Sequence, residues 1–179
     1  VVNMALAVDA DGTSDAGSWD ATDGNGADSG PLNGWVRTLD LVRYRISFDT
    51  VGGPGADNLT LRSTLPPGMV WADLPGVCLA TFIVPPSTVS EDQRTLVCNL
   101  GDIPPGYAAD LFFHARPLTS VADATSMPVR FEYEHQEGAD TVSGATNTAT
   151  VQVSAGQSVD LVQNAFDSVI PGQTFQVEW

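Results

Sequence analysis

Short runs in which apolar and polar residues alternate recur along most of this chain. The clearest run spans residues 129–136, where Val129, Phe131, Tyr133 and His135 share one face and charged or amide side chains share the other. A period of two residues is typical of a strand with one buried face, and no window shows the 3.6-residue apolar stripe of a helix. The same criterion predicts further strands at residues 2–8, 42–49, 58–65, 69–72, 96–100, 109–116 and 148–154.

Turn-forming residues separate these runs. Residues 52–55 (GGPG), 66–68 (PPG) and 104–106 (PPG) combine the fixed φ of proline with the free φ of glycine, which suits a reversal of the chain. Short β-patterned runs with such punctuation predict an all-β fold. The arrangement we expect is an antiparallel β-sandwich, in which each sheet buries one face against the other.

The alternation stops between residues 9 and 34. This stretch is rich in Asp and Gly and contains no basic residue. A loop of that length inside a compact domain usually has a function, an ordering metal or mobility. Calcium takes about six to eight oxygen ligands, which closely spaced carboxylates on a glycine-rich loop can supply. We therefore predict a calcium site with the following candidate ligands: Asp9, Asp11, Asp15, Asp20, Asp23, Asn25 and Asp28.

Two other interpretations of this acidic insert loop stay open. Acidic clusters on loops are common without metal, and the spacing is not that of an EF-hand, because Gly12 is fourth from Asp9 rather than sixth. Trp19 and Trp35 lie in or beside the loop. They make residues 9–35 a candidate binding surface for a carbohydrate or protein ligand, while the alternative for Trp35 is packing over one end of the sandwich.

The chain contains two cysteines, Cys78 and Cys98, which bracket what we interpret as a polar loop. They permit one disulfide that closes about 20 residues and adds about 3 kcal/mol of stability on the chain-entropy model. The alternative is a pair of buried free thiols. We favour the disulfide because the composition resembles that of extracellular proteins, and disulfides persist in oxidising compartments.

Charge excludes one class of partner. The 22 acidic residues outnumber the 7 basic ones, which are all arginine, and the net charge is −15. Nucleic-acid binding relies on Lys and Arg to replace phosphate counterions, so we expect no nucleic-acid partner. The acidity itself is typical of a soluble, self-repelling surface. No apolar run approaches the roughly 20 residues that cross a bilayer, so we expect no membrane insertion of this segment.

The sequence offers no catalytic constellation, and we predict that the chain is not an enzyme. His114 and His135 are single residues at strand spacing, without the Cys/His pattern of a zinc site. Glu132 and Glu134 are a conceivable carboxylate pair, but both project to the polar side of one strand. No serine has the context of a nucleophile elbow, and no glycine run precedes a helix as phosphate binding requires.

The end of the chain allows two domain assignments. We assign residues 1–157 to one sandwich domain that contains the acidic insert loop. Residues 158–179 end in the alternation Phe175, Val177, Trp179 and repeat the plan of the first strands. They are either the last strands of this sandwich or the start of a following repeat. The abrupt first and last residues suggest a piece of a longer polypeptide.

Several motifs together resemble a known family. LTLRSTLPPGMVWA, a cysteine, RTLVCNLGDIPPGYAADLFFHARP and ATNTATVQV occur in this order, between about Leu39 and Ser154. This order resembles the "conserved repeat" domain of bacterial and archaeal surface proteins, a domain of unknown function. The long Asp/Gly insert and the absence of Lys depart from that pattern. Without Lys, the internal Lys–Asn crosslink that is common in surface pilin modules cannot form.

The resemblance implies an immunoglobulin-like sandwich that is exported to the cell surface or cell wall. It also implies tandem repetition, with neighbouring repeats of the same chain as partners, and a structural or adhesive role. Calcium bound near a module boundary would stiffen such an array, because an ion that binds only the ordered form stabilises it by mass action. Recognition of a surface glycan or protein through the acidic insert loop is the alternative function.

Overall fold

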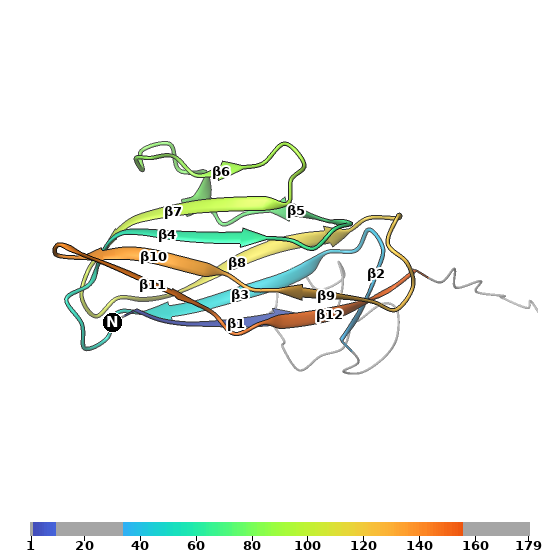
Figure 1. Ribbon diagram of the computed structural model, residues 1–179, viewed down its shortest axis with the longest axis horizontal. Coiled ribbons are helices and arrows are strands. Elements are labelled where there is room, and N and C mark those ends of the chain that lie inside the picture. Colours follow the sequence, from blue (N-terminus) through green and yellow to red (C-terminus); the bar gives the residue numbers. More distant parts are fainter. Residues whose placement is uncertain (1, 10–33, 156–179) are drawn as a thin grey trace, which may run out of the picture.

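The computed structural model describes residues 2–9 and 34–155 and shows a protein built of strands (Figure 1). One short 3-10 helix, η1 (Gly76–Leu79), is present in this part of the chain. The strands are β1 (Asn3–Asp9), β2 (Trp35–Arg37), β3 (Val42–Asp49), β4 (Ala56–Thr64), β5 (Met69–Asp73), β6 (Thr88–Val89), β7 (Thr95–Ile103), β8 (Ala108–Pro117), β9 (Thr125–Val129), β10 (Glu132–Glu137), β11 (Asp140–Ala145) and β12 (Ala149–Ser154).

Two sheets form the body of a sandwich. One has four strands in the order β1-β3-β8-β5, and the other has five in the order β11-β10-β4-β7-β6. The alternation of β3 decides what it buries: Val42, Tyr44, Ile46 and Phe48 are at most 5% exposed, while the residues between them are only partly buried. The opposite sheet contributes Leu59, Leu61, Leu96 and Cys98, which are fully buried. The all-β sandwich that the sequence predicts is therefore confirmed.

Three aromatic rings occupy the centre of the core. The ring centroids of Phe113 and Phe131 are 4.9 Å apart, and those of Trp71 and Phe131 are 5.7 Å apart. The indole N–H of Trp71 donates to the backbone oxygen of Arg94 at 3.0 Å, so the single polar atom of this side chain is satisfied. Truncation of such a buried ring to alanine typically costs about 3–5 kcal/mol.

One predicted strand is two strands in the structure. Residues 129–136 divide into the end of β9 and most of β10, with Arg130 and Phe131 between them. β9 pairs with β12 in a three-stranded sheet, whereas β10 pairs with β4 and β11 in the five-stranded sheet. Strands β2, β6 and β11 were not predicted from the sequence. Strands β9 to β12 thus form one long hairpin that bends and passes from one sheet to another.

Polar side chains fix this bend. The backbone N–H of Phe131 donates to the hydroxyl of Thr146 at 3.1 Å, and the backbone N–H of Thr146 donates to the carbonyl of Phe131 at 2.9 Å. The next residue, Asn147, accepts from the backbone N–H of Leu6 at 2.9 Å and donates to its carbonyl at 2.8 Å. Asn147 therefore acts as a strand partner for β1 where the hairpin turns away, which gives the NTATV motif a physical role.

The third sheet corrects the expectation of purely antiparallel pairing. Its order is β2-β12-β9, and β2 runs parallel to β12, with Trp35 opposite Gln152. A parallel pair requires a long connection rather than a tight turn. In this chain β2 and β12 are more than a hundred residues apart in sequence, and the whole sandwich separates them.

The two ends of the described chain lie far apart. β1 begins at one end of the long axis, and β12 finishes at the other (Figure 1). Chain that continues from either side would therefore leave the sandwich in opposite directions.

Candidate functional site

Residues 74–90, here called the stapled segment, stand off from the edge of the five-stranded sheet. In Figure 1 the segment rises beyond β7 and contains η1 and the short edge strand β6. Cys78 in η1 forms a disulfide with Cys98 in β7, with a Cα–Cα distance of 5.0 Å. The disulfide favoured by the sequence analysis is therefore present, and both sulfurs lie in the core, since the two cysteines are at most 4% exposed.

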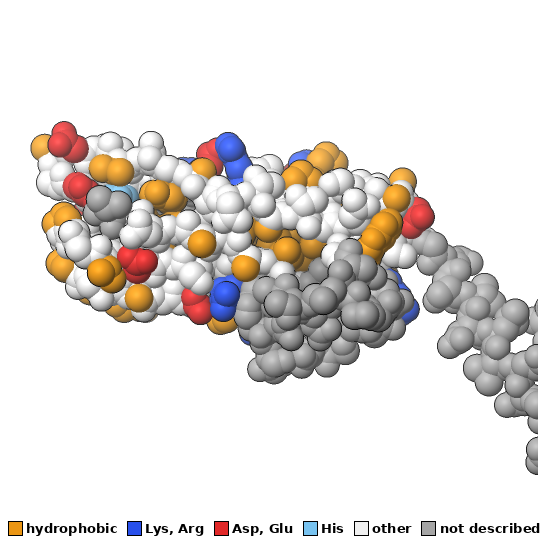
Figure 2. Space-filling model, turned by 90° about the horizontal axis from the view of Figure 1, so that it is seen from below, with side chains coloured by type: hydrophobic (Ala, Val, Ile, Leu, Met, Phe, Trp, Pro, Cys, Tyr) orange, Lys and Arg blue, Asp and Glu red, His pale blue; other side chains and the backbone are white. Residues whose placement is uncertain are grey.

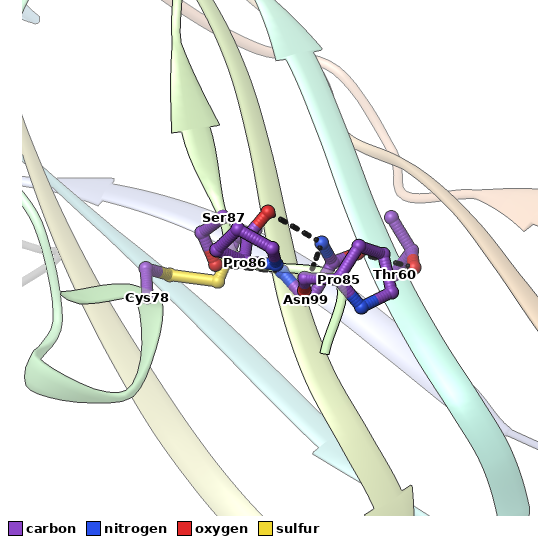
Figure 3. The surroundings of a disulfide bond; sticks show 7 residues. Thr60, Cys78, Pro85, Pro86, Ser87 and Asn99 are labelled. Carbon is purple, nitrogen blue, oxygen red and sulfur yellow. Dashed lines mark hydrogen bonds between the residues drawn. A yellow bond between two sulfur atoms is a disulfide. The ribbon is translucent and has the colours of Figure 1, made fainter. Parts of the chain in front are cut away.

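Asn99, the residue after Cys98, holds the middle of the same segment (Figure 3). Its side-chain amide donates to the carbonyls of Pro85 and Pro86 at 2.9 and 3.1 Å, and its side-chain oxygen accepts from Thr60 at 2.7 Å. Its backbone N–H donates to the hydroxyl of Ser87 at 2.9 Å. With 6% of Asn99 exposed, these bonds satisfy a buried amide. Two adjacent residues of β7 thus fix the segment at two points.

The segment is apolar where the sequence analysis expected a polar loop. None of residues 74–90 is charged. Leu79, Phe82 and Val84 are 62%, 84% and 82% exposed, and Val89 is 40% exposed. The mixed composition of the whole 78–98 interval obscured this, because Glu91, the first charged residue, follows only after β6. Large apolar side chains gathered on one surface segment commonly indicate an interaction site.

A mixed polar and aromatic group lies on the outer face of β8. His114 Nδ1 lies 3.6 Å from a carboxylate oxygen of Asp73. The guanidinium of Arg43 lies over the ring of Phe112, 4.5 Å from its centroid. Burial lowers the pKa of His114 and Arg43 lowers it further, while Asp73 acts in the opposite direction. The imidazole is therefore neutral at physiological pH, which suits a structural contact rather than a permanent ion pair.

Most predicted calcium ligands lie outside the described residues. These are Asp11, Asp15, Asp20, Asp23, Asn25 and Asp28, and Trp19 lies outside them as well. Asp9 is described, and its position corrects the start of the loop. It is the last residue of β1, opposite Arg43 in the sheet register, and only 2% exposed. Trp35 is partly buried in β2 rather than in a loop. The calcium and ligand-binding roles stay predictions.

His135, one of the two histidines considered for a zinc site, is a buried polar side chain of β10. His135 is 1% exposed, and neither ring nitrogen has a hydrogen-bond partner within the described part of the chain. Its ring stacks on Tyr133, with centroids 6.5 Å apart. Across residues 2–9 and 34–155, no group of three His, Cys, Asp or Glu side chains gathers as a metal ion would require. His135 is thus a buried ring that packs against Tyr133.

Charge on the described surface is mixed. Figure 2 shows one face of the molecule, where acidic, basic and apolar side chains are interspersed rather than gathered by sign. Ion pairs join Arg45 to Asp110 and Arg130 to Glu132. Exposed pairs of this kind stabilise a fold by at most about 1 kcal/mol. Within the described ranges no helix has the length and apolarity of a membrane span.

Comparison with sequence families gives a partial match. Residues 2–84 match the model of the N-terminal domain of an uncharacterised plasmid protein, pXO2-29. This is less than half of the chain. No curated protein matches the sequence. The resemblance to the conserved repeat domain stays a prediction.

Solved structures of low sequence identity share the fold. BcpA, the major pilin subunit of Bacillus cereus, is 9% identical, with a TM-score of 0.51 over 86% of this chain. The full-length major pilin SpaD from Corynebacterium diphtheriae is 15% identical, with a TM-score of 0.53 over 83% of this chain. The matches span 40% of the BcpA chain and 34% of the SpaD chain. At these identities the likeness concerns the fold, which is an immunoglobulin-like β-sandwich.

Proposed function

We propose that this chain is a structural and adhesive module of a secreted, multi-repeat protein on the cell surface. The placement of the two ends of the described sandwich carries the proposal. Because β1 starts and β12 finishes at opposite ends of the long axis, copies joined in series would extend into a stalk (Figure 1). The shared fold of the two pilins and the buried disulfide support the same role, since disulfides are typical of oxidising compartments outside the cytosol.

Surface labelling tests this function. Antibodies raised against the folded sandwich should label intact, unpermeabilised cells of the source organism. Deletion of the coding region should remove the label and reduce attachment to surfaces. Antibodies against a cytosolic protein serve as the control for cell integrity. Label that appears only after the cells are broken would show that the protein is intracellular and would contradict the proposal.

We further propose that the acidic insert loop binds calcium and stiffens the module. The support is the acidic residues Asp11 and Asp15, with a second cluster at Asp23 and Asp28, and the preference of calcium for such oxygen ligands. Millimolar calcium should raise the melting temperature of the chain, and a chelator should lower it. Replacement of Asp11 and Asp15 by Asn should remove the response. A melting curve that neither treatment changes excludes the site.

A further inference from the structure

A hollow of about 300 Å³ lies between β5 and the stapled segment. It is lined by Trp71, Ala72, Asp73, Leu74, Leu79, Val89 and Gln93. Its volume is at the lower limit of known ligand sites, so it suits a single side chain rather than a whole cofactor. Because Leu79 and Val89 belong to the exposed part of the stapled segment, the apolar wall of the hollow continues onto the surface.

The floor and the wall of this hollow are held in place before any ligand arrives. The backbone N–H of Trp71 donates to the carbonyl of Gln93 at 2.8 Å, and the indole N–H of Trp71 donates to the backbone carbonyl of Arg94. The wall belongs to the segment that the disulfide and Asn99 fix at two points. A preorganised site loses little conformational entropy on binding, so a modest contact area can give measurable affinity.

The polar rim is acidic. Asp73 is the acidic residue among those that line the hollow, and its side chain is 70% exposed. An apolar floor beside an exposed carboxylate complements a ligand that is both apolar and cationic.

We propose that this hollow binds a short peptide segment of another protein, in which an apolar side chain stands beside a lysine or arginine. The apolar side chain would enter between Trp71 and Leu79, and the cation would pair with Asp73. A second copy of this chain fits poorly, because it has no lysine and a net charge of −15. Among its seven arginines, Arg45, Arg94 and Arg130 already pair with carboxylates of the same chain. This binding role is additional to the structural role and does not depend on it.

Fluorescence anisotropy with the full chain and designed heptapeptides tests the proposal. One set of peptides has a central Phe or Leu flanked by two lysines. A second set has glutamate in place of lysine, and a third has a central Ser. The first set should bind at least tenfold more tightly than the other two. The proposal is overturned if no lysine peptide shows saturable binding. It is also overturned if the glutamate peptides bind as tightly as the lysine peptides.

Variants locate the site. Leu79→Ser and Asp73→Asn should each weaken binding of the lysine peptides at least fivefold. Both side chains are largely exposed, so the variants should keep the circular dichroism spectrum of the parent. The matched controls are Val51→Ser, which removes an apolar side chain exposed to 63% on another turn, and Asp140→Asn, which removes an exposed carboxylate of β11. Equal loss in the controls overturns the assignment.

Two other occupants have distinct signatures. If a second copy fills the hollow, sedimentation will show a concentration-dependent dimer that Leu79→Ser abolishes. If the exposed Phe82 and Val84 insert into lipid, phosphatidylcholine vesicles will co-sediment the chain, and Leu79→Ser with Phe82→Ser will release it. Either result, without tight binding of the lysine peptides, replaces the peptide ligand and overturns the proposal.

Discussion

Loss of the Cys78–Cys98 disulfide should destabilise the whole sandwich rather than loosen one loop. The bond spans 20 residues, which corresponds to about 3 kcal/mol of loop-closure entropy in the unfolded chain. The effect is global because Cys98 lies in β7. This strand pairs with β4 along most of the length of both strands. For a domain of this size, about 3 kcal/mol corresponds to a fall of roughly 10 °C in melting temperature.

A comparison of two perturbations separates chain entropy from packing. Unfolding and refolding in reductant keeps both sulfur atoms and should cost about 3 kcal/mol. The double variant Cys78→Ala, Cys98→Ala also removes two buried atoms, since the side chains are 4% and 0% exposed. A void left by one buried atom costs roughly 1 kcal/mol, so the double variant should lose about 5 kcal/mol in total.

Urea denaturation at pH 7 measures both losses. The slope of the unfolding free energy against urea should rise without the disulfide, because the freed chain exposes more surface when it unfolds. Reductant should have no effect on the alanine variant, which controls for other actions of the reagent. A loss below about 1 kcal/mol on reduction would refute the reasoning, since it would mean that the unfolded chain gains little freedom.

Two further predictions concern single side chains. Asn147→Ala should lower the free energy of unfolding, measured in urea, by about 1–3 kcal/mol, because both backbone groups of Leu6 lose their partner. The control Asn3→Ala removes an exposed hydrogen bond and should cost less than about 0.5 kcal/mol. Equal losses in the two variants would contradict the role of Asn147. Because burial lowers the pKa of His114, the unfolded chain takes up its proton first as pH falls below about 6.5. Stability should therefore decline from neutral pH downwards, more steeply with Asp73→Asn and less steeply with His114→Gln; identical pH profiles for all three proteins would count against this assignment.

The alternation of apolar residues predicts most of the sandwich because burial of one strand face leaves a direct mark on the sequence. It misses the bend at Arg130 and Phe131 for a physical reason. Val129, Phe131 and His135 face the same core on both sides of the bend, so the pattern continues while the partner strand changes. β11 was missed because it is an edge strand that buries no side chain fully, and its residues have no apolar alternation to detect.

The stapled segment could be predicted only in part. Its covalent closure follows from the two cysteines. Its position as a loop also agrees with the prediction, but its apolar surface does not, because a run such as Phe82, Ile83 and Val84 ordinarily indicates a buried strand. The hydrogen bonds from Asn99 decide the outcome, since they hold the two prolines that follow this run at the sheet edge. A single asparagine in a strand gives no sign of that role before the chain is folded.

The opposite placement of the two chain ends has a mechanical consequence. A load applied between residue 2 and residue 155 would act along the strands, because β1 and β12 both run roughly parallel to the long axis (Figure 1). β1 would then slide against β3, and β12 against β9, so the hydrogen bonds of each ladder would share the force together rather than break one after another from an end. Such shear geometry resists extension far better than peeling does, and the sandwich is oriented to experience it whenever it is pulled from both ends.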